Sequence, residues 1–80
     1  MVEMVLTLKA CRINCNLKIK EVAELVGRTD RTVKNWESGR SIPNGQDLKK
    51  LSAIYRVDID HIFLGDTVSL KAFYKQKVSL

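Results

Sequence analysis

Residues 18–40, KIKEVAELVGRTDRTVKNWESGR, contain two short helical patterns with a turn between them. The first pattern has apolar side chains three and four positions apart, at Ile19, Val22, Ala23 and Val26. Gly27 then interrupts the pattern, and glycine readily adopts the left-handed conformation that ends many helices. In the second pattern, Val33 and Trp36 lie about one turn apart and face inward. The stretch therefore predicts two short helices joined by a tight turn.

The outward face of the second helix is polar and basic. At about 3.6 residues per turn, four side chains fall opposite the apolar pair: Arg31, Lys34, Asn35 and Ser38. Guanidinium, ammonium and amide groups are those with which proteins contact base edges and phosphates. We therefore interpret the stretch as a helix-turn-helix whose second helix reads the major groove of DNA.

The charge distribution is consistent with a polyanionic partner. The chain has a formal net charge of +5 and an isoelectric point of about 9.5. The positive excess lies mainly in residues 27–40 and 66–80, whereas residues 41–65 carry equal numbers of basic and acidic side chains. A basic reader helix favours nucleic-acid binding, although a net charge of this size is also typical of an ordinary soluble surface.

Length and composition predict one small, mostly helical domain. The chain has 80 residues, of which 45% are hydrophobic and one is proline. A transmembrane helix needs about 18 or more consecutive apolar residues, and no such run occurs. The first twelve residues contain an early Glu3 and no small-residue cleavage site, so we expect no signal peptide and a cytoplasmic protein.

The residue types needed for metal binding or catalysis are sparse. Cys11 and Cys15 are four positions apart, a poor geometry for a disulfide, so we expect two reduced thiols with Cys11 in the core. His61 is the only histidine, and we expect it to lie exposed on the surface. We find no metal-ligand spacing, nucleophile–base pair or phosphate loop. The sequence therefore predicts no enzyme, no metal, no cofactor and no small-molecule ligand.

Helical spacing and turn residues divide the chain into five expected helices. They cover about residues 4–14, 18–26, 30–38, 46–55 and 59–64. Asn16, Gly27 and Gly39 are expected to end the first three, and Thr29 and Asp58 to cap the third and the last. The apolar positions expected inside the flanking helices are Val5, Leu8, Cys11, Ile13, Leu48, Leu51, Ile54, Tyr55, Ile59, Ile62 and Phe63.

Residues 66–80 fit two patterns. Alternate positions from Val68 to Leu80 are mostly apolar, which favours an extended strand. Leu70, Phe73, Tyr74 and Val78 also form a helical stripe. We favour the strand, and we expect this tail to pack either across a dimer interface or on its own domain, because exposed apolar groups would form a sticky patch.

Together these features resemble the lambda-repressor/Cro-like helix-turn-helix domain, also called the XRE family. The resemblance covers about residues 4–65 and rests on spaced markers: Leu8-x-x-Cys11-Arg12, Leu17-x-x-x-x-Val22-Ala23, Gly27, Val33, Trp36-Glu37-x-Gly39-x-x-x-Pro43, Leu48-x-x-Leu51 and Val57-x-Ile59-Asp60. It implies an all-α, five-helix domain over residues 1–65 and a tail over residues 66–80. It further implies a transcriptional regulator, similar to small phage Cro proteins and repressors, that binds double-stranded operator DNA as a homodimer.

The candidate DNA contacts lie on the reader helix and on the residues before and after it. Residues expected to read bases are Asp30, Arg31, Lys34 and Asn35, and residues expected to contact the DNA backbone are Lys18, Lys20, Arg28, Thr29, Thr32, Ser38 and Arg40. Arg31 can grip a guanine edge with two donors. Hydroxyls near a helix N-terminus suit phosphates. The resemblance also implies a partly buried ion pair between Arg12 and Glu37, so Glu37 is structural rather than catalytic.

Two positions depart from the family pattern. The family often has glutamine at the start of the motif's first helix, where this chain has Ile19, so Lys18 or Lys20 would take over the phosphate contact. Asp30 stands where the first reading residue is often polar and neutral. Its carboxylate could accept from a cytosine amino group or simply favour the helix N-terminus electrostatically.

Two alternatives oppose these interpretations. Trp36 could stack on a base, but its register beside Val33 favours core packing. The rival function is a protein-interaction module of the same fold, an antitoxin or anti-repressor that acts through a protein partner. The basic, amide-bearing reader face favours DNA, whereas an acidic or apolar face would have favoured the rival.

Overall fold

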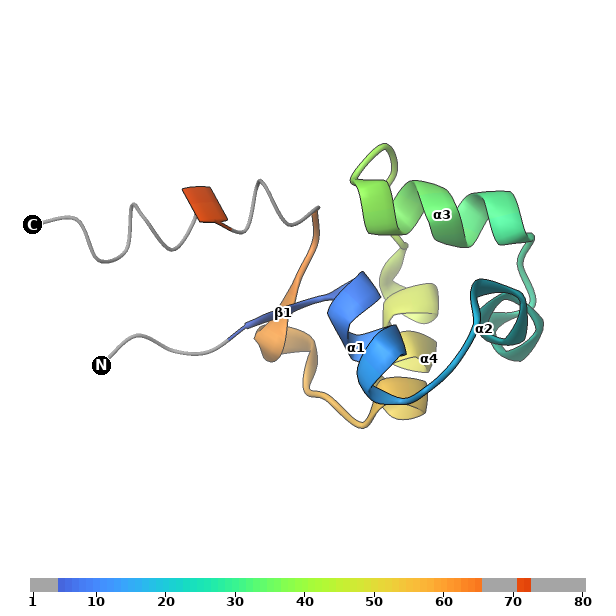
Figure 1. Ribbon diagram of the computed structural model, residues 1–80, viewed down its shortest axis with the longest axis horizontal. Helices are drawn as coiled ribbons and strands as arrows, with labels where there is room; N and C mark the ends of the chain where they lie inside the picture. Colours follow the sequence, from blue (N-terminus) through green and yellow to red (C-terminus); the bar gives the residue numbers. More distant parts are fainter. Residues whose placement is uncertain (1–4, 66–70, 73–80) are drawn as a thin grey trace, which may run out of the picture.

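Within residues 5–65, the chain forms four α-helices, one 3-10 helix and one short strand pair. The structure, a computed structural model, describes residues 5–65 and 71–72. In chain order the elements are β1 (Leu6–Thr7), α1 (Leu8–Asn14), α2 (Ile19–Val26), α3 (Asp30–Ser38), α4 (Gly45–Tyr55), the 3-10 helix η1 (Ile59–His61) and β2 (Ile62–Phe63) (Figure 1). Among the described helices, none is long and apolar enough to cross a membrane.

The boundaries of the helix-turn-helix agree with the sequence prediction within one residue, since α2 begins at Ile19 rather than at Lys18. Helix α2 ends at Gly27, which adopts a left-handed φ of 76°, and α3 ends at Gly39 with a φ of 81°. Thr29 is the N-cap of α3, since its Oγ1 accepts a hydrogen bond from the amide of Thr32 at 3.2 Å. Asn16 also has a positive φ, of 58°, after α1. Local signals were sufficient here because each of these residues satisfies its own helix end.

The helices enclose one core. Its buried apolar side chains are Leu8, Cys11, Val22, Ala23, Val26, Val33, Trp36, Leu51, Tyr55 and Ile62. Most were expected, but Ile13 and Ile59 are exposed. Ile13 lies about 200° around α1 from Cys11, so the face that buries Cys11 turns Ile13 to solvent.

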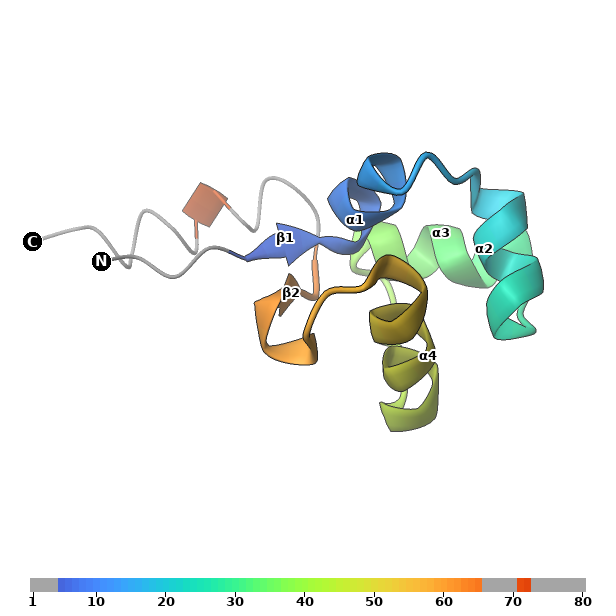
Figure 2. The same ribbon diagram turned by 90° about the horizontal axis from the view of Figure 1, so that it is seen from below.

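The domain is mostly helical, as expected, but the count of five helices is not confirmed, and both ends of the domain differ from the prediction. Residues 6–7 pair in parallel with residues 62–63, with Leu6 opposite Ile62 and Thr7 opposite Phe63; Figure 2 shows β1 beside β2. Helix α1 begins only at Leu8, because Thr7 is its extended N-cap and accepts from the Ala10 amide at 3.0 Å.

The expected fifth helix is shorter than predicted. Only Ile59–His61 are helical, as a 3-10 turn, and Asp58 makes no side-chain cap bond to it. The chain then extends at Ile62, where β-branched and aromatic side chains suit a strand. Helix α4 also begins earlier than expected, at Gly45, because the Asn44 side chain accepts from the Asp47 amide at 2.8 Å. The expected strand in residues 66–80 lies outside the described residues, apart from residues 71–72.

Candidate nucleic-acid interface

Helix α3 presents a polar face on the outside of the domain. In Figure 1 it runs along one edge, with the other helices on one side of it. Val33 and Trp36 are buried against those helices. On the opposite face, Arg31 and Lys34 are exposed and Asn35 is half-buried, and Asp30 is exposed at the start of the helix. All four candidate base readers therefore lie on one short helix, and three of them are exposed.

The N-terminal end of α3 carries two neighbouring hydroxyls. The Oγ1 atoms of Thr29 and Thr32 are 3.0 Å apart, and Thr29 Oγ1 also accepts the Thr32 amide. The amino end of a helix is partly positive, so these hydroxyls lie where a phosphate oxygen would be favoured. Asp30 is in the same first turn. The negative charge of its carboxylate stabilises the partly positive end of the helix, whether or not the carboxylate also contacts a base.

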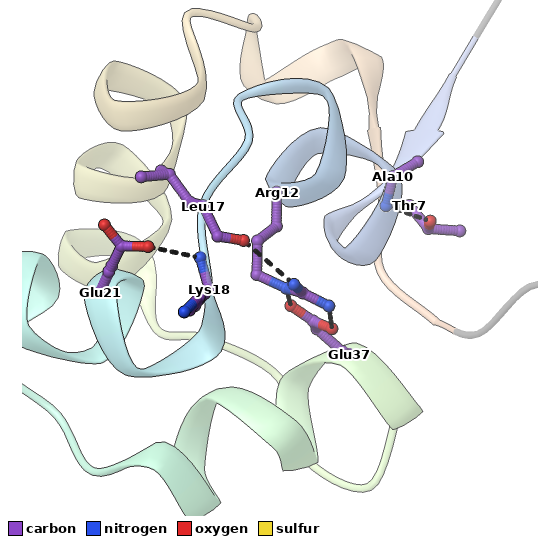
Figure 3. A network of polar contacts seen from close by, with 7 residues as sticks. All are labelled: Thr7, Ala10, Arg12, Leu17, Lys18, Glu21 and Glu37. Atoms are coloured by element: carbon purple, nitrogen blue, oxygen red, sulfur yellow. Dashed lines mark hydrogen bonds and ion pairs between the residues drawn. The ribbon is translucent and has the colours of Figure 1, made fainter.

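The remaining backbone candidates flank the reader helix. Ser38 donates its hydroxyl to the Asn35 carbonyl at 3.2 Å, and Arg40, exposed after the turn at Gly39, donates its amide to the same carbonyl at 2.9 Å. At the start of α2, the Lys18 amide donates to Glu21 Oε1 at 2.9 Å (Figure 3). The side chains of Lys18 and Lys20 are exposed, whereas Ile19 is half-buried and packs against the core.

A bidentate ion pair holds the C-terminal end of α3. Arg12 Nε lies 2.7 Å from Glu37 Oε2, and Arg12 Nη2 lies 3.2 Å from Glu37 Oε1 (Figure 3). The side chains are only 13% and 7% exposed. The hydrogen bonds with Glu37 raise the pKa of Arg12. Because Arg12 Nη1 also donates to the Leu17 carbonyl at 3.1 Å, this pair joins α1, the following loop and α3.

A second ion pair was not expected from the sequence. Arg28 Nε lies 3.3 Å from Asp47 Oδ1, and Arg28 Nη2 lies 3.0 Å from Asp47 Oδ2. The Asp47 side chain is 5% exposed and that of Arg28 is 46% exposed. One signal could have revealed the pair. Asp47 lies about one turn before Leu51, on the apolar face of α4, where a carboxylate needs a cation.

The two thiols and the Tyr55 phenol lie in the core or against it. Cys11 and Cys15 are free, and Cys15 Sγ contacts the Tyr55 carbonyl oxygen at 3.7 Å. Burial raises the pKa of the Cys11 thiol and of the Tyr55 phenol, so both stay protonated near neutral pH. Within residues 5–65 and 71–72, no group of three His, Cys, Asp or Glu side chains could hold a metal ion.

The fold and the exposed reader helix define a helix-turn-helix domain, and comparison with known proteins agrees. A helix-turn-helix family model matches residues 8–62. The chain therefore belongs to the XRE-type helix-turn-helix family.

Two relatives show how this family is used elsewhere. The chain is 47% identical over 34 residues, 42% of its length, to Antitoxin HigA-2 of Vibrio cholerae. It is 32% identical over 59 residues, 74% of its length, to the HTH-type transcriptional activator BcrR of Enterococcus faecalis. These matches span only 33% and 29% of the two relatives.

Proposed function

We propose that the chain is a sequence-specific transcriptional regulator, of bacterial or phage origin and acting as a repressor, that reads operator DNA with α3 in the major groove. The observation that carries the proposal is the outer face of α3. It gathers Arg31, Lys34 and Asn35 on a helix whose other side is fixed in the core by Val33 and Trp36. Family membership and the match to a transcriptional activator support regulation of transcription through DNA binding.

Selection of bound duplexes from a random DNA pool, followed by footprinting, tests this function. We expect one recurrent sequence to be enriched and a protected major groove over it. Binding that does not discriminate among sequences, or no binding at all, would contradict the proposal.

We assign two kinds of contact to the interface. Asp30, Arg31, Lys34 and Asn35 read bases. The DNA backbone is held by Lys18, Lys20, Thr29, Thr32, Ser38 and Arg40. Arg28 is not among them because its guanidinium is bound to Asp47.

Substitutions should separate the two kinds of contact. Arg31→Ala is expected to weaken specific binding by about 1–3 kcal/mol and to relax the preference at one base pair. Lys20→Ala and Arg40→Ala should instead weaken binding to all sequences about equally and flatten the salt dependence. Titrations of the selected duplex and a scrambled duplex at several salt concentrations measure both effects. An equal loss on both duplexes for Arg31→Ala would mean that Arg31 is not a base reader.

We further propose that binding is dimeric, on a pseudo-palindromic site. One helix of nine residues contacts few base pairs, whereas two copies about 34 Å apart read two half-sites. The apolar residues of the tail, 66–80, would contribute to self-association. We expect truncation after Gly65 to lower the self-association constant measured by sedimentation while the monomer stays folded. Full-affinity, specific binding of a strict monomer to one isolated half-site would refute the dimer.

The match to Antitoxin HigA-2 favours a second candidate, an antitoxin whose main partner is another protein. Affinity purification from the native host would test it. Recovery of one stoichiometric protein partner, together with failure to select any DNA sequence, would favour the antitoxin over the regulator.

A further inference from the structure

Arg28 occupies the middle of the turn that sets the direction of the reader helix. The turn consists of residues 27–29, between the end of α2 and the start of α3. The Arg28 amide donates to the Ala23 carbonyl at 2.9 Å, so its backbone is tied to α2. The next residue, Thr29, is the N-cap of α3. A movement of the Arg28 backbone would therefore change the angle between the axes of α2 and α3.

Helix α4 holds this turn through two polar contacts. Asp47 Oδ1 accepts a hydrogen bond from Arg28 Nε at 3.3 Å, and Asp47 Oδ2 lies 3.0 Å from Arg28 Nη2 in an ion pair. Lys50, nearly one turn further along α4, places its Nζ 3.4 Å from the carbonyl of Val26, the last residue of α2. The first turns of α4 thus bind both the end of α2 and the residue that follows Gly27.

We infer that Arg28 is a positioning residue for DNA reading: held by Asp47, it fixes the N-terminal end of α3 as Arg12 fixes the C-terminal end through Glu37. This inference rests on the proposed function, because its consequence is the presentation of α3 to DNA. In both pairs a bidentate arginine meets a carboxylate that is almost fully buried. The reader helix is therefore fixed at both ends to different helices, α4 and α1.

A contact between Arg28 and a DNA phosphate is energetically less favourable than its contact with Asp47. Moving the guanidinium to a phosphate would leave the buried Asp47 carboxylate without its cation, which is costly in a low-dielectric interior. While the pair stays intact, its two charges cancel. It therefore adds little to the counterion release that drives backbone binding.

Four variants separate positioning from phosphate binding. Arg28→Lys keeps the charge but loses the two-donor fork. We expect it to lower affinity for the selected duplex about tenfold, or about 1.4 kcal/mol, with little change on scrambled DNA and an unchanged salt slope. Asp47→Asn should also weaken specific binding. The double variant Arg28→Met/Asp47→Leu replaces the pair with apolar groups. It should stay folded and recover most of the specific binding. Lys49→Gln, at an exposed lysine on α4, measures how much a change of one charge unit on α4, away from the pair, alters binding.

A phosphate contact predicts different results for the same variants. Asp47→Asn would free Arg28 and remove one negative charge, so binding to every duplex would become tighter. Arg28→Lys would bind nearly as the parent does. The double variant would lose affinity on both duplexes, with a salt slope smaller by about 0.9. These three results would overturn the inference.

Residual dipolar couplings of the free protein provide a readout that does not depend on DNA. In Arg28→Lys, the α3 amides should report a changed orientation relative to α4, whereas Lys49→Gln should match the parent. An unchanged orientation would overturn the inference even if the DNA selection succeeds. If the parent selects no sequence, the proposed function fails, and the couplings still decide whether Arg28 orients α3.

Discussion

Replacing Arg12 with methionine is expected to lower the free energy of unfolding by about 3–5 kcal/mol. The substitution keeps a long side chain but leaves the Glu37 carboxylate, 7% exposed, without its cation. It also removes the donor to the Leu17 carbonyl. Small domains are stable by only about 5–15 kcal/mol, so the loss would leave a marginal fold. Urea denaturation followed by circular dichroism measures it.

Lys9→Met is the matched control for this prediction. Lys9 is exposed on the same helix, and substitution there should change stability by no more than about 0.5 kcal/mol. If Arg12→Met costs no more than Lys9→Met, the pair contributes nothing to stability, and the C-terminal end of α3 is held by packing alone.

The second large effect is expected at Trp36. Trp36→Ala should destabilise the domain by about 3–5 kcal/mol, since the indole is buried in the core and its removal leaves a cavity. Trp36→Phe keeps most of the volume and should cost clearly less. Thermal and urea unfolding of the two variants test the order. A base-stacking role would give the opposite signature, a stable Trp36→Ala protein that has lost DNA binding.

The helix-turn-helix could be predicted from sequence because each of its signals is local. Gly27, Thr29 and Gly39 act within one turn of the helix ends that they cap. The spacing of Val33 and Trp36 is enough to orient α3, so the direction of Arg31 and Lys34 follows from the helical period. The side chains on the outer face of α3 could therefore also be predicted from a few consecutive residues.

The features that could not be predicted depend on residues distant in the chain. The helical pattern through Val5 and Leu8 does not reveal that Leu6 pairs with Ile62, so β1 was expected to be the first turn of α1. Likewise, Arg28 has the charge of a phosphate contact, and only the fold brings Asp47 to its guanidinium. In both cases a tertiary contact overrides what the neighbouring residues suggest.

The parallel pairing of β1 with β2 also bears on the order in which the domain forms. Helices α2 and α3 follow one another in the chain, and contacts of this kind form early because the loop between the helices is short. Leu6, however, finds its partner only at Ile62, near the other end of the described domain. During synthesis, the first strand must therefore wait unpaired until almost all of the domain has left the ribosome, and α1 cannot be anchored through β1 before then.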